Sequence, residues 1–297
     1  MYCAPTRIFG MVDNSGISLS IVVPIGAMVG QLENLLSWID TIQDYSAQVI
    51  LVVDEKNDGT YAELIRALEQ RSIVQSVLVL NAVCNGPGKA RNLGTSEAKG
   101  KWITYWDSDD RPIVKETFRA IQQSKEGIDA IVCRYENINE SGEVTSPMLS
   151  GLQIALNPGI WRFIFKRENF KEVKFPDIRL AEDQIFLVLS GVFSKKLEFY
   201  NTVCYQYIQS SKNQLTKDKR NLPDLLKALD LLSDHNRSKV IGAGTEKNYL
   251  NVIIFRLSLT SIKHNPTKTI RHFLKNPGVL ITFLKSAPFL IITRIKN

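Results

Sequence analysis

The sequence predicts an α/β protein with an open, mostly parallel sheet, helices on both faces of that sheet and a helical segment at the C-terminus. Strand and helix patterns alternate between residues 18 and 106, which is typical of right-handed crossovers between parallel strands. From residue 222 onward the apolar residues follow helical spacing only. The chain has 297 residues, of which 44% are hydrophobic, so it can bury a sizeable core.

Four apolar runs in the first half, bounded by turn residues, predict buried parallel strands. They are residues 18–23, 49–53, 77–80 and 102–106. Between them, apolar residues recur at helical spacing and predict three helices. These helices run from about Leu32 to Ile42, Gly59 to Leu68 and Gly88 to Ala98.

The second half is less regular. It predicts strands at 130–133 and 203–208, helices at 161–168 and 182–189, and a polar loop at 210–218. We expect four parts in the chain: an N-terminal extension (1–16), a nucleotide-sugar-binding half (17–112), an acceptor-binding half of the same domain (113–212) and a basic helical region (213–297).

The positive charge of the chain belongs to its C-terminal end. The net charge is +7, yet no acidic residue follows Glu246, and the last 51 residues carry nine lysines and arginines. The first 246 residues therefore have a net charge of −2. This argues against nucleic acid bound along the whole body and favours a local basic surface.

The location of the protein is predicted from what the sequence lacks. No apolar run reaches the length of a membrane span, and the N-terminus does not follow the pattern of a signal peptide. The four cysteines, Cys3, Cys84, Cys133 and Cys204, are far apart, which favours reduced thiols over disulfides or zinc ligands. We expect a cytoplasmic protein.

Polar and acidic residues follow the predicted strands. Pro24, Asp54 with Glu55, and the run Asp107–Asp110 come directly after three of them. Ligands of an open parallel sheet bind beyond these carboxyl ends. Asp107, Asp109 and Asp110 offer the oxygen ligands that Mg²⁺ or Mn²⁺ prefers, although such a cluster is also typical of a solvated turn.

A second motif places two cations, Lys89 and Arg91, at the start of a predicted helix. Helix N-termini attract anions, so these side chains could hold a diphosphate. A solvated, capped helix start explains the same residues equally well.

In this order and spacing, the motifs resemble the family 2 glycosyltransferases of the GT-A fold. The resemblance extends from about Ser18 to Ile208 and rests on six segments. They are Ser20–Pro24, Val52–Glu55 with Asp58–Thr60, Gly86–Gly88 with Ala90–Gly94, Tyr105–Asp110, Trp161 with Phe165–Arg167, and Glu182–Phe186.

The resemblance implies transfer of a sugar from a nucleotide-sugar, commonly a UDP-sugar, with inversion and with Mn²⁺ or Mg²⁺ as cofactor. It implies that Pro24, Asp54, Glu55, Lys89, Arg91 and Asp109 bind the nucleotide and that Asp107, Asp109 and Asp110 bind the metal. Trp161 and Glu182 would contact the acceptor, a glycan or a lipid-linked acceptor. Asp183 would be the catalytic base; a helix-stabilising carboxylate is the simpler interpretation of that residue alone.

Two alternatives to this enzyme are open at this point: a nucleotidyltransferase on a similar sheet, and a non-catalytic protein that binds nucleotide-sugars. The residues after Pro24, Ile25–Met28, lack the glycine-rich loop of the first class. No Q-x-x-R-W motif follows Asp183, so we expect the addition of a single sugar. The basic C-terminal region either binds an anionic membrane surface or packs on the catalytic domain.

Overall fold

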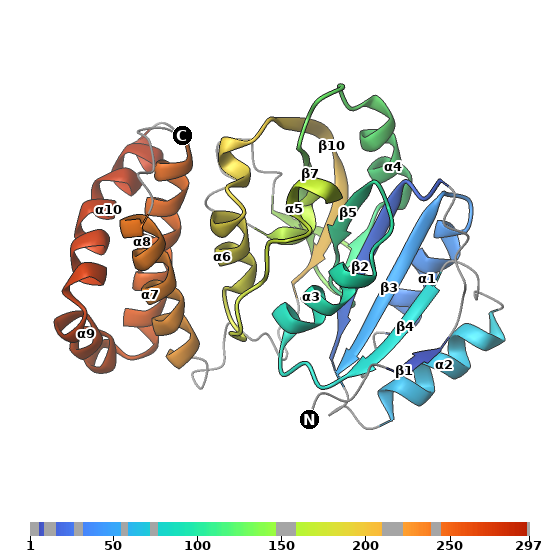
Figure 1. Cartoon of the computed structure of the whole chain (residues 1–297), viewed down its shortest axis with the longest axis horizontal. Helices are drawn as coiled ribbons and strands as arrows, with labels where there is room; N and C mark the ends of the chain where they lie inside the picture. Colours follow the sequence, from blue (N-terminus) through green and yellow to red (C-terminus); the bar gives the residue numbers. More distant parts are fainter. Residues whose placement is uncertain are drawn as a thin grey trace.

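The computed structural model describes residues 6–8, 16–26, 32–54, 59–71, 77–146, 159–209, 222–238 and 245–295. In these residues one mixed β-sheet is flanked by helices, and a group of helices follows it at the C-terminus (Figure 1). This confirms the predicted α/β class and the C-terminal helical segment.

Four parallel strands form the central part of the sheet, as predicted. They are β2 (Leu19–Ile25), β3 (Ala47–Asp54), β4 (Val77–Ala82) and β5 (Trp102–Tyr105). β2 pairs with both β3 and β5, and β3 pairs with β4. Because all four run the same way, the residues that follow them lie at one edge of the sheet.

The remaining described strands extend this central part on both sides. The full order is β1–β4–β3–β2–β5–β9–β7–β10–β6, with β8 paired to β7. The added strands are β1 (Thr6–Ile8), β6 (Arg111–Pro112), β7 (Ala130–Ile138), β8 (Val144–Ser146), β9 (Phe163–Lys166) and β10 (Leu197–Ile208). β1 belongs to the predicted N-terminal extension, and its pairing with β4 makes it an edge strand of the sheet.

The predicted helix at 161–168 is wrong. A short 3₁₀ turn, Ile160–Arg162, is followed by β9 and then by the one-turn helix α5 (Arg167–Phe170). β9 pairs antiparallel with β5 on one side and β7 on the other. Its residues Phe163, Ile164 and Phe165 are buried, and aromatic and β-branched residues suit such a central strand.

Helices cover both faces of the sheet. α1 (Leu32–Ile42), α2 (Thr60–Gln70) and α4 (Val114–Gln123) pack on one face. α3 (Pro87–Glu97) and α6 (Glu182–Leu189) pack on the other. The alternation within β2 shows the division: Ile21 and Val23 join the first core, whereas Val22 joins the second.

The C-terminal region consists of α7 (Leu222–Ser238), α8 (Thr245–His264), α9 (Pro266–Lys275) and α10 (Pro277–Ile295). Its buried core includes Leu229, Ile253 and Phe273, and it continues into Ile185 and Val188 of α6. The helical region therefore packs directly on α6, one of the helices that cover the sheet. In the residues that the structure describes, no helix is both long and apolar enough to cross a membrane.

Close packing of α3 on β2 depends on a glycine. A Cβ atom at Gly94 would lie 2.3 Å from Cγ1 of the buried Val22. Contacts this short do not occur between real side-chain atoms, so only glycine allows the helix to approach the strand at this distance. The approach positions the N-terminal turn of α3 relative to the strand ends.

We predict that Gly94→Ala destabilises the protein by about 1–2 kcal/mol, because the overpacking against Val22 exceeds the gain in helix propensity. Chemical denaturation of both proteins measures this difference. Gly26→Ala is the matched control, since nothing lies within 4 Å of a Cβ at Gly26. Equal stabilities of the two variants would contradict the packing argument.

Candidate active site

The predicted nucleotide-binding residues at the strand ends are partly described. Pro24 and Asp54 are both half-buried at the ends of β2 and β3. Oδ1 of Asp54 accepts a hydrogen bond from the backbone N–H of Cys84, at 3.3 Å. This bond ties the end of β3 to the segment after β4. Glu55 lies outside the described residues.

The N-terminal turn of α3 is pressed against the segment that precedes α6. A Cβ at Gly88 would lie 2.9 Å from the carbonyl oxygen of Pro176. The amide of Asn92 both donates to the carbonyl and accepts from the N–H of Phe175, at 2.9 and 2.8 Å. Lys89 forms an ion pair with Asp177 at 2.9 Å. These contacts fix the position of the start of α3 relative to the segment that precedes α6.

Arg91 lies at the centre of this region and is 4% exposed. Its Nη1 contacts Oε1 of Glu182 at 2.7 Å, and its Nη2 contacts Oδ1 of Asp107 at 2.7 Å. The guanidinium also lies over the ring of Phe175, 5.5 Å from its centroid. One buried cation thus connects the end of β5 to the start of α6.

The charges around Arg91 influence one another. Burial alone would lower the pKa of Arg91, but Asp107, Glu182 and Asp183 together raise it above its ordinary value. Burial raises the pKa of Glu182 to about 7, although Arg91 opposes this change. Glu182 is therefore a buried partner of Arg91, and its predicted contact with an acceptor stays a prediction.

The acidic run after β5 divides into two kinds of carboxylate. Asp110 is buried: its Oδ2 accepts from the Tyr205 hydroxyl and its Oδ1 from the N–H of Ile208, both at 2.8 Å. Tyr205 in turn accepts a hydrogen bond from the N–H of Asp107, at 3.0 Å. These bonds attach the acidic loop to β10 and hold Asp110 in place, and metal binding by Asp110 stays a prediction.

Asp109 has the opposite character. It is exposed and forms no ion pair with any described residue. Desolvation, followed by the charge of Asp107, raises its pKa to about 6. An uncompensated carboxylate beside a second one fits a divalent cation. No three His, Cys, Asp or Glu side chains in the described ranges are already arranged around a metal, so the ion would share Asp107 and Asp109 with ligand oxygens.

Asp183 lies in the first turn of α6 and is half-buried. Its Oδ1 accepts from the N–H of Gln184 at 2.7 Å. Burial raises its pKa, which Arg91 opposes, and a raised pKa makes a carboxylate a better base at neutral pH. The preceding residue, Ala181, has a φ of 68°, a left-handed conformation that is costly for alanine and frequent at functional sites.

Aromatic side chains line the other side of the acidic run. The ring of Trp161 stacks on Tyr205 and on Tyr207, with centroids 4.6 and 5.7 Å away. Burial raises the pKa of Tyr207, and the charges of Asp110, Asp107, Asp109 and Asp183 raise it further. The phenol of Tyr207 is therefore near both the acidic run and Asp183. These groups are 73 or more residues apart in the chain.

Sequence reasoning missed three residues near this site. Tyr205 and Tyr207 lie in a run that the sequence identifies only as a strand, and their register next to Asp110 depends on long-range pairing. Burial raises the pKa of Asp183, and the charge of Arg256 on α8 is close enough to oppose this rise. Burial also lowers the pKa of Arg256 itself. No local signal marks Arg256, because only the packing of α8 brings it to the site.

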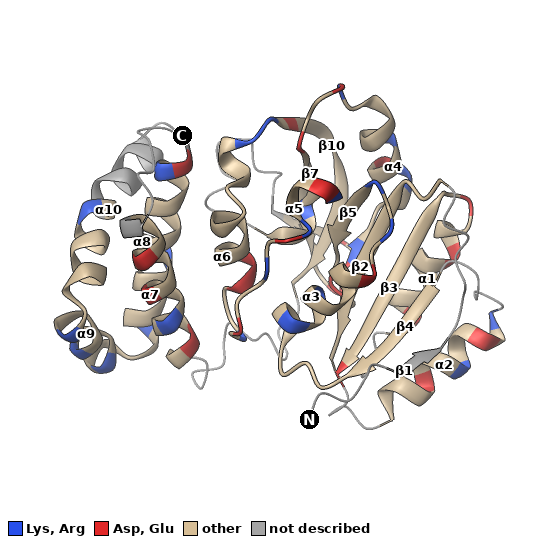
Figure 2. Cartoon of the chain, in the orientation of Figure 1, with Lys and Arg blue, Asp and Glu red and all other residues tan. Residues whose placement is uncertain are grey.

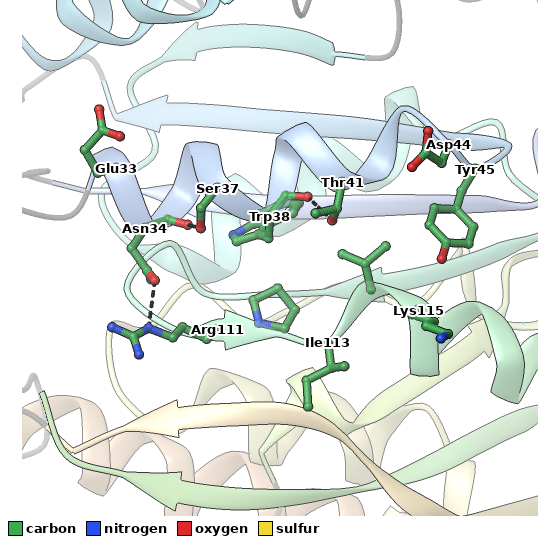
Figure 3. A pocket seen from close by; sticks show the side chains of 12 residues that line it. Glu33, Asn34, Ser37, Trp38, Thr41, Asp44, Tyr45, Arg111, Ile113 and Lys115 are labelled. Carbon is green, nitrogen blue, oxygen red and sulfur yellow. Dashed lines mark hydrogen bonds between the residues drawn. The ribbon is translucent and has the colours of Figure 1, made fainter. Parts of the chain in front are cut away.

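A separate pocket of about 990 Å³ lies between α1 and the start of α4 (Figure 3). It is lined by Glu33, Asn34, Ser37, Trp38, Thr41, Asp44, Tyr45 and Arg111–Lys115. None of the predicted site residues lines it. Its link to the acidic run is Asn34, which donates to the carbonyl of Asp110 and accepts from Nε of Arg111.

The fold and this arrangement of carboxylates define a glycosyltransferase of the GT-A class. The chain belongs to glycosyl transferase family 2, whose model matches residues 27–193. This also sets aside the nucleotidyltransferase alternative.

Two curated relatives are similar in sequence. "Glycosyltransferase GlyG" of Streptococcus pneumoniae is 29% identical over 223 residues, which are 65% of this chain and 71% of that protein. The "Poly(ribitol-phosphate) beta-glucosyltransferase" of Bacillus spizizenii is 28% identical over 210 residues, 64% of this chain. The match spans only 32% of that second protein, so the similarity is confined to one part of it.

Two solved structures share the fold. S. aureus TarS 1–349 in complex with UDP-GlcNAc has a TM-score of 0.64 at 16% identity, over 91% of this chain and 81% of that one. The mannosyltransferase PcManGT of Pyrobaculum calidifontis, in complex with GDP-Man and Mn²⁺, has a TM-score of 0.58 at 15% identity. That match covers 96% of this chain and 86% of PcManGT.

We predict that Glu182→Gln destabilises the protein by about 3 kcal/mol, because it leaves the buried Arg91 with one of its two charged partners. Urea denaturation measures the loss. Glu168→Gln removes a matched carboxylate from the exposed pair with Lys166 and should cost less than about 0.5 kcal/mol. Similar losses in both variants would show that Arg91 does not need Glu182.

Proposed function

We propose that the protein is an inverting, metal-dependent glycosyltransferase that moves one sugar from a UDP-sugar to a hydroxyl group of a glycan or lipid-linked acceptor. The observation that carries this proposal is the convergence of Asp107, Glu182 and Asp183 on the buried Arg91. Arg91 connects two places. One is the strand edge, where a donor would bind, and the other is the start of α6, which carries the carboxylate that would act as base. The solved complex of TarS with UDP-GlcNAc supports a UDP-sugar as donor.

The donor and the acceptor would bind to different parts of the same sheet. Residues 17–112 contribute Pro24, Asp54, Arg91 and the acidic run, and they form the donor half. Residues 113–212 contribute Trp161, Tyr207 and Asp183, and they form the acceptor half. The acceptors named for the relatives, poly(ribitol-phosphate) chains, support a hydroxyl-rich polymer as the acceptor class.

The residues of the chain have separate tasks in this reaction. Asp183 accepts the proton of the acceptor hydroxyl. The hydroxyl oxygen forms the new bond to the anomeric carbon as the bond from that carbon to the leaving diphosphate breaks. Arg91 fixes the position of Asp107 relative to α6 through its ion pairs with Asp107 and Glu182. A flat aromatic face at Trp161 or Tyr207 would stack on a sugar ring.

The metal would be held by Asp109 and Asp107. Mn²⁺ or Mg²⁺ at this position would neutralise charge that develops on the leaving diphosphate. The Mn²⁺ complex of PcManGT supports the choice of metal. Lys89, half-buried at the start of α3, would add a positive charge near the phosphates, where the helix N-terminus also favours an anion.

We predict that Asp183→Asn lowers the rate of sugar transfer by about 10²–10⁴-fold, because an amide cannot accept the proton. The affinity for UDP should change by less than about twofold, because the side chain is assigned to the acceptor hydroxyl and not to the nucleotide. Steady-state kinetics with a UDP-sugar screen and calorimetry with UDP measure the two quantities.

The control is Asp40→Asn, which changes an exposed carboxylate paired with Arg71. Full activity of Asp183→Asn would exclude Asp183 as the base. A wild-type protein that binds UDP but transfers no sugar from any UDP-sugar of the screen would favour a non-catalytic protein.

We predict that Asp109→Asn abolishes the gain in UDP affinity that Mn²⁺ causes, because it removes the exposed metal ligand. Asp110→Asn should instead lower stability by about 1–3 kcal/mol, because it disturbs two buried hydrogen bonds. Calorimetry with UDP, with and without Mn²⁺, and chemical denaturation separate the two effects. An unchanged Mn²⁺ effect in Asp109→Asn would contradict this assignment.

A further inference from the structure

The last three helices carry most of the exposed large apolar side chains of the described residues. Five of the eight such side chains lie in α8, α9 and α10: Leu259, Ile270, Leu274, Ile281 and Leu284. Leu274 is 73% exposed and Leu284 is 59% exposed. Single exposed leucines are ordinary, but their concentration in one short region is not.

Exposed cations accompany these apolar side chains. Lys263, Lys268, Arg271, Lys275 and Lys285 are all exposed, and no acidic residue occurs after Glu246. We call these ten residues the basic–apolar surface. Asp230 of α7, paired with His272 of α9 at 3.0 Å, is a carboxylate at the edge of this region, but the cations outnumber it. A surface that combines several aliphatic side chains with an excess of positive charge selects an anionic and partly apolar partner.

Helical spacing places the two kinds of side chain together on each helix. In α9, Ile270 and Leu274 are four residues apart, and Arg271 and Lys275 flank them. The opposite side of α9, with Thr269 and Phe273, is buried. In α10, Leu284 and Lys285 follow Ile281 by three and four residues, so each helix exposes one mixed stripe.

The two stripes belong to the helices that lie farthest from the sheet. α9 and α10 form the outer edge of the molecule, on the opposite side of α7 and α8 from the catalytic part (Figure 1). Figure 2 shows blue segments gathered on α9, a blue segment on α10 and no red on either helix. A flat partner could therefore reach these helices without meeting the sheet.

We propose that the basic–apolar surface binds the headgroup region of an anionic lipid bilayer. Lysines and arginines would meet anionic headgroups while the leucines and isoleucines enter the acyl boundary. A second copy of the chain would bring the same cations against these and repel them. A soluble polyanion would satisfy the cations but leave Leu274 and Leu284 exposed to water. This inference does not depend on the identity of the donor or acceptor.

The full chain should sediment with vesicles made of equal parts of phosphatidylglycerol and phosphatidylcholine, and it should not sediment with phosphatidylcholine alone. Arg271→Gln combined with Lys275→Gln should weaken the binding by about fivefold for each lost cation. Ile270→Ser combined with Leu274→Ser should weaken it by about tenfold or more, because less apolar area enters the bilayer. High salt should weaken the wild type.

Matched variants elsewhere on the protein serve as controls. Phe199→Ser removes a side chain of β10 that is 53% exposed, and Lys195→Gln combined with Lys196→Gln removes two exposed cations of the catalytic part. These variants should bind the vesicles as the wild type does. Equal weakening in the controls, absence of wild-type binding, or binding that needs the cations but not Ile270 and Leu274 would each overturn the proposal; the last result would indicate a soluble polyanion.

Discussion

The buried ion pairs of Arg91 are the interaction on which the site depends. Removing an arginine from water costs several kcal/mol, and only paired carboxylates with good geometry offset that cost. Both contacts of the guanidinium are 2.7 Å long, and they fix its orientation. Because one carboxylate follows β5 and the other begins α6, the pairing keeps the acidic run and Asp183 at a constant separation. Buried charge pairs of this kind add little net stability compared with an apolar core, so the arrangement is better understood as a device for positioning.

Three further constraints reinforce this positioning. Tyr205 joins the backbone of Asp107 to the carboxylate of Asp110, which anchors the acidic run to β10. Glycine at position 94 lets α3 lie close to β2. Because Arg91 belongs to α3, this packing also limits the distance between Arg91 and the sheet. The left-handed conformation of Ala181 then turns the chain into α6. The exposed Asp109 is held in place by buried neighbours on both sides, which is how a carboxylate that lacks its own partner can remain ordered.

The sequence predicted the elements whose signal is local. The four parallel strands and the helices between them follow from apolar spacing, and the acidic run and Arg91 follow from their places after a strand and at a helix start. The strand β9 could not be predicted, because Phe163, Ile164 and Phe165 are apolar on both faces and a short apolar run fits a helix equally well. Nor could the pairing of Glu182 with Arg91, residues 91 positions apart. Contacts of this kind exist only after the sheet and α6 have assembled.

The C-terminal helices are better regarded as a support of the catalytic site than as an appendage. Their buried core continues into Ile185 and Val188, on the helix whose first turn carries Glu182 and Asp183. Burial raises the pKa of Asp183, and the charge of Arg256 on α8 is among the influences that oppose this rise. α9 and α10 are thus connected to the helix of the candidate base by one continuous buried core. If the outer stripes of these helices rest on a bilayer, the same packing fixes the orientation of the site relative to the lipid surface, and the acceptor half then meets acceptors presented at a defined height above it.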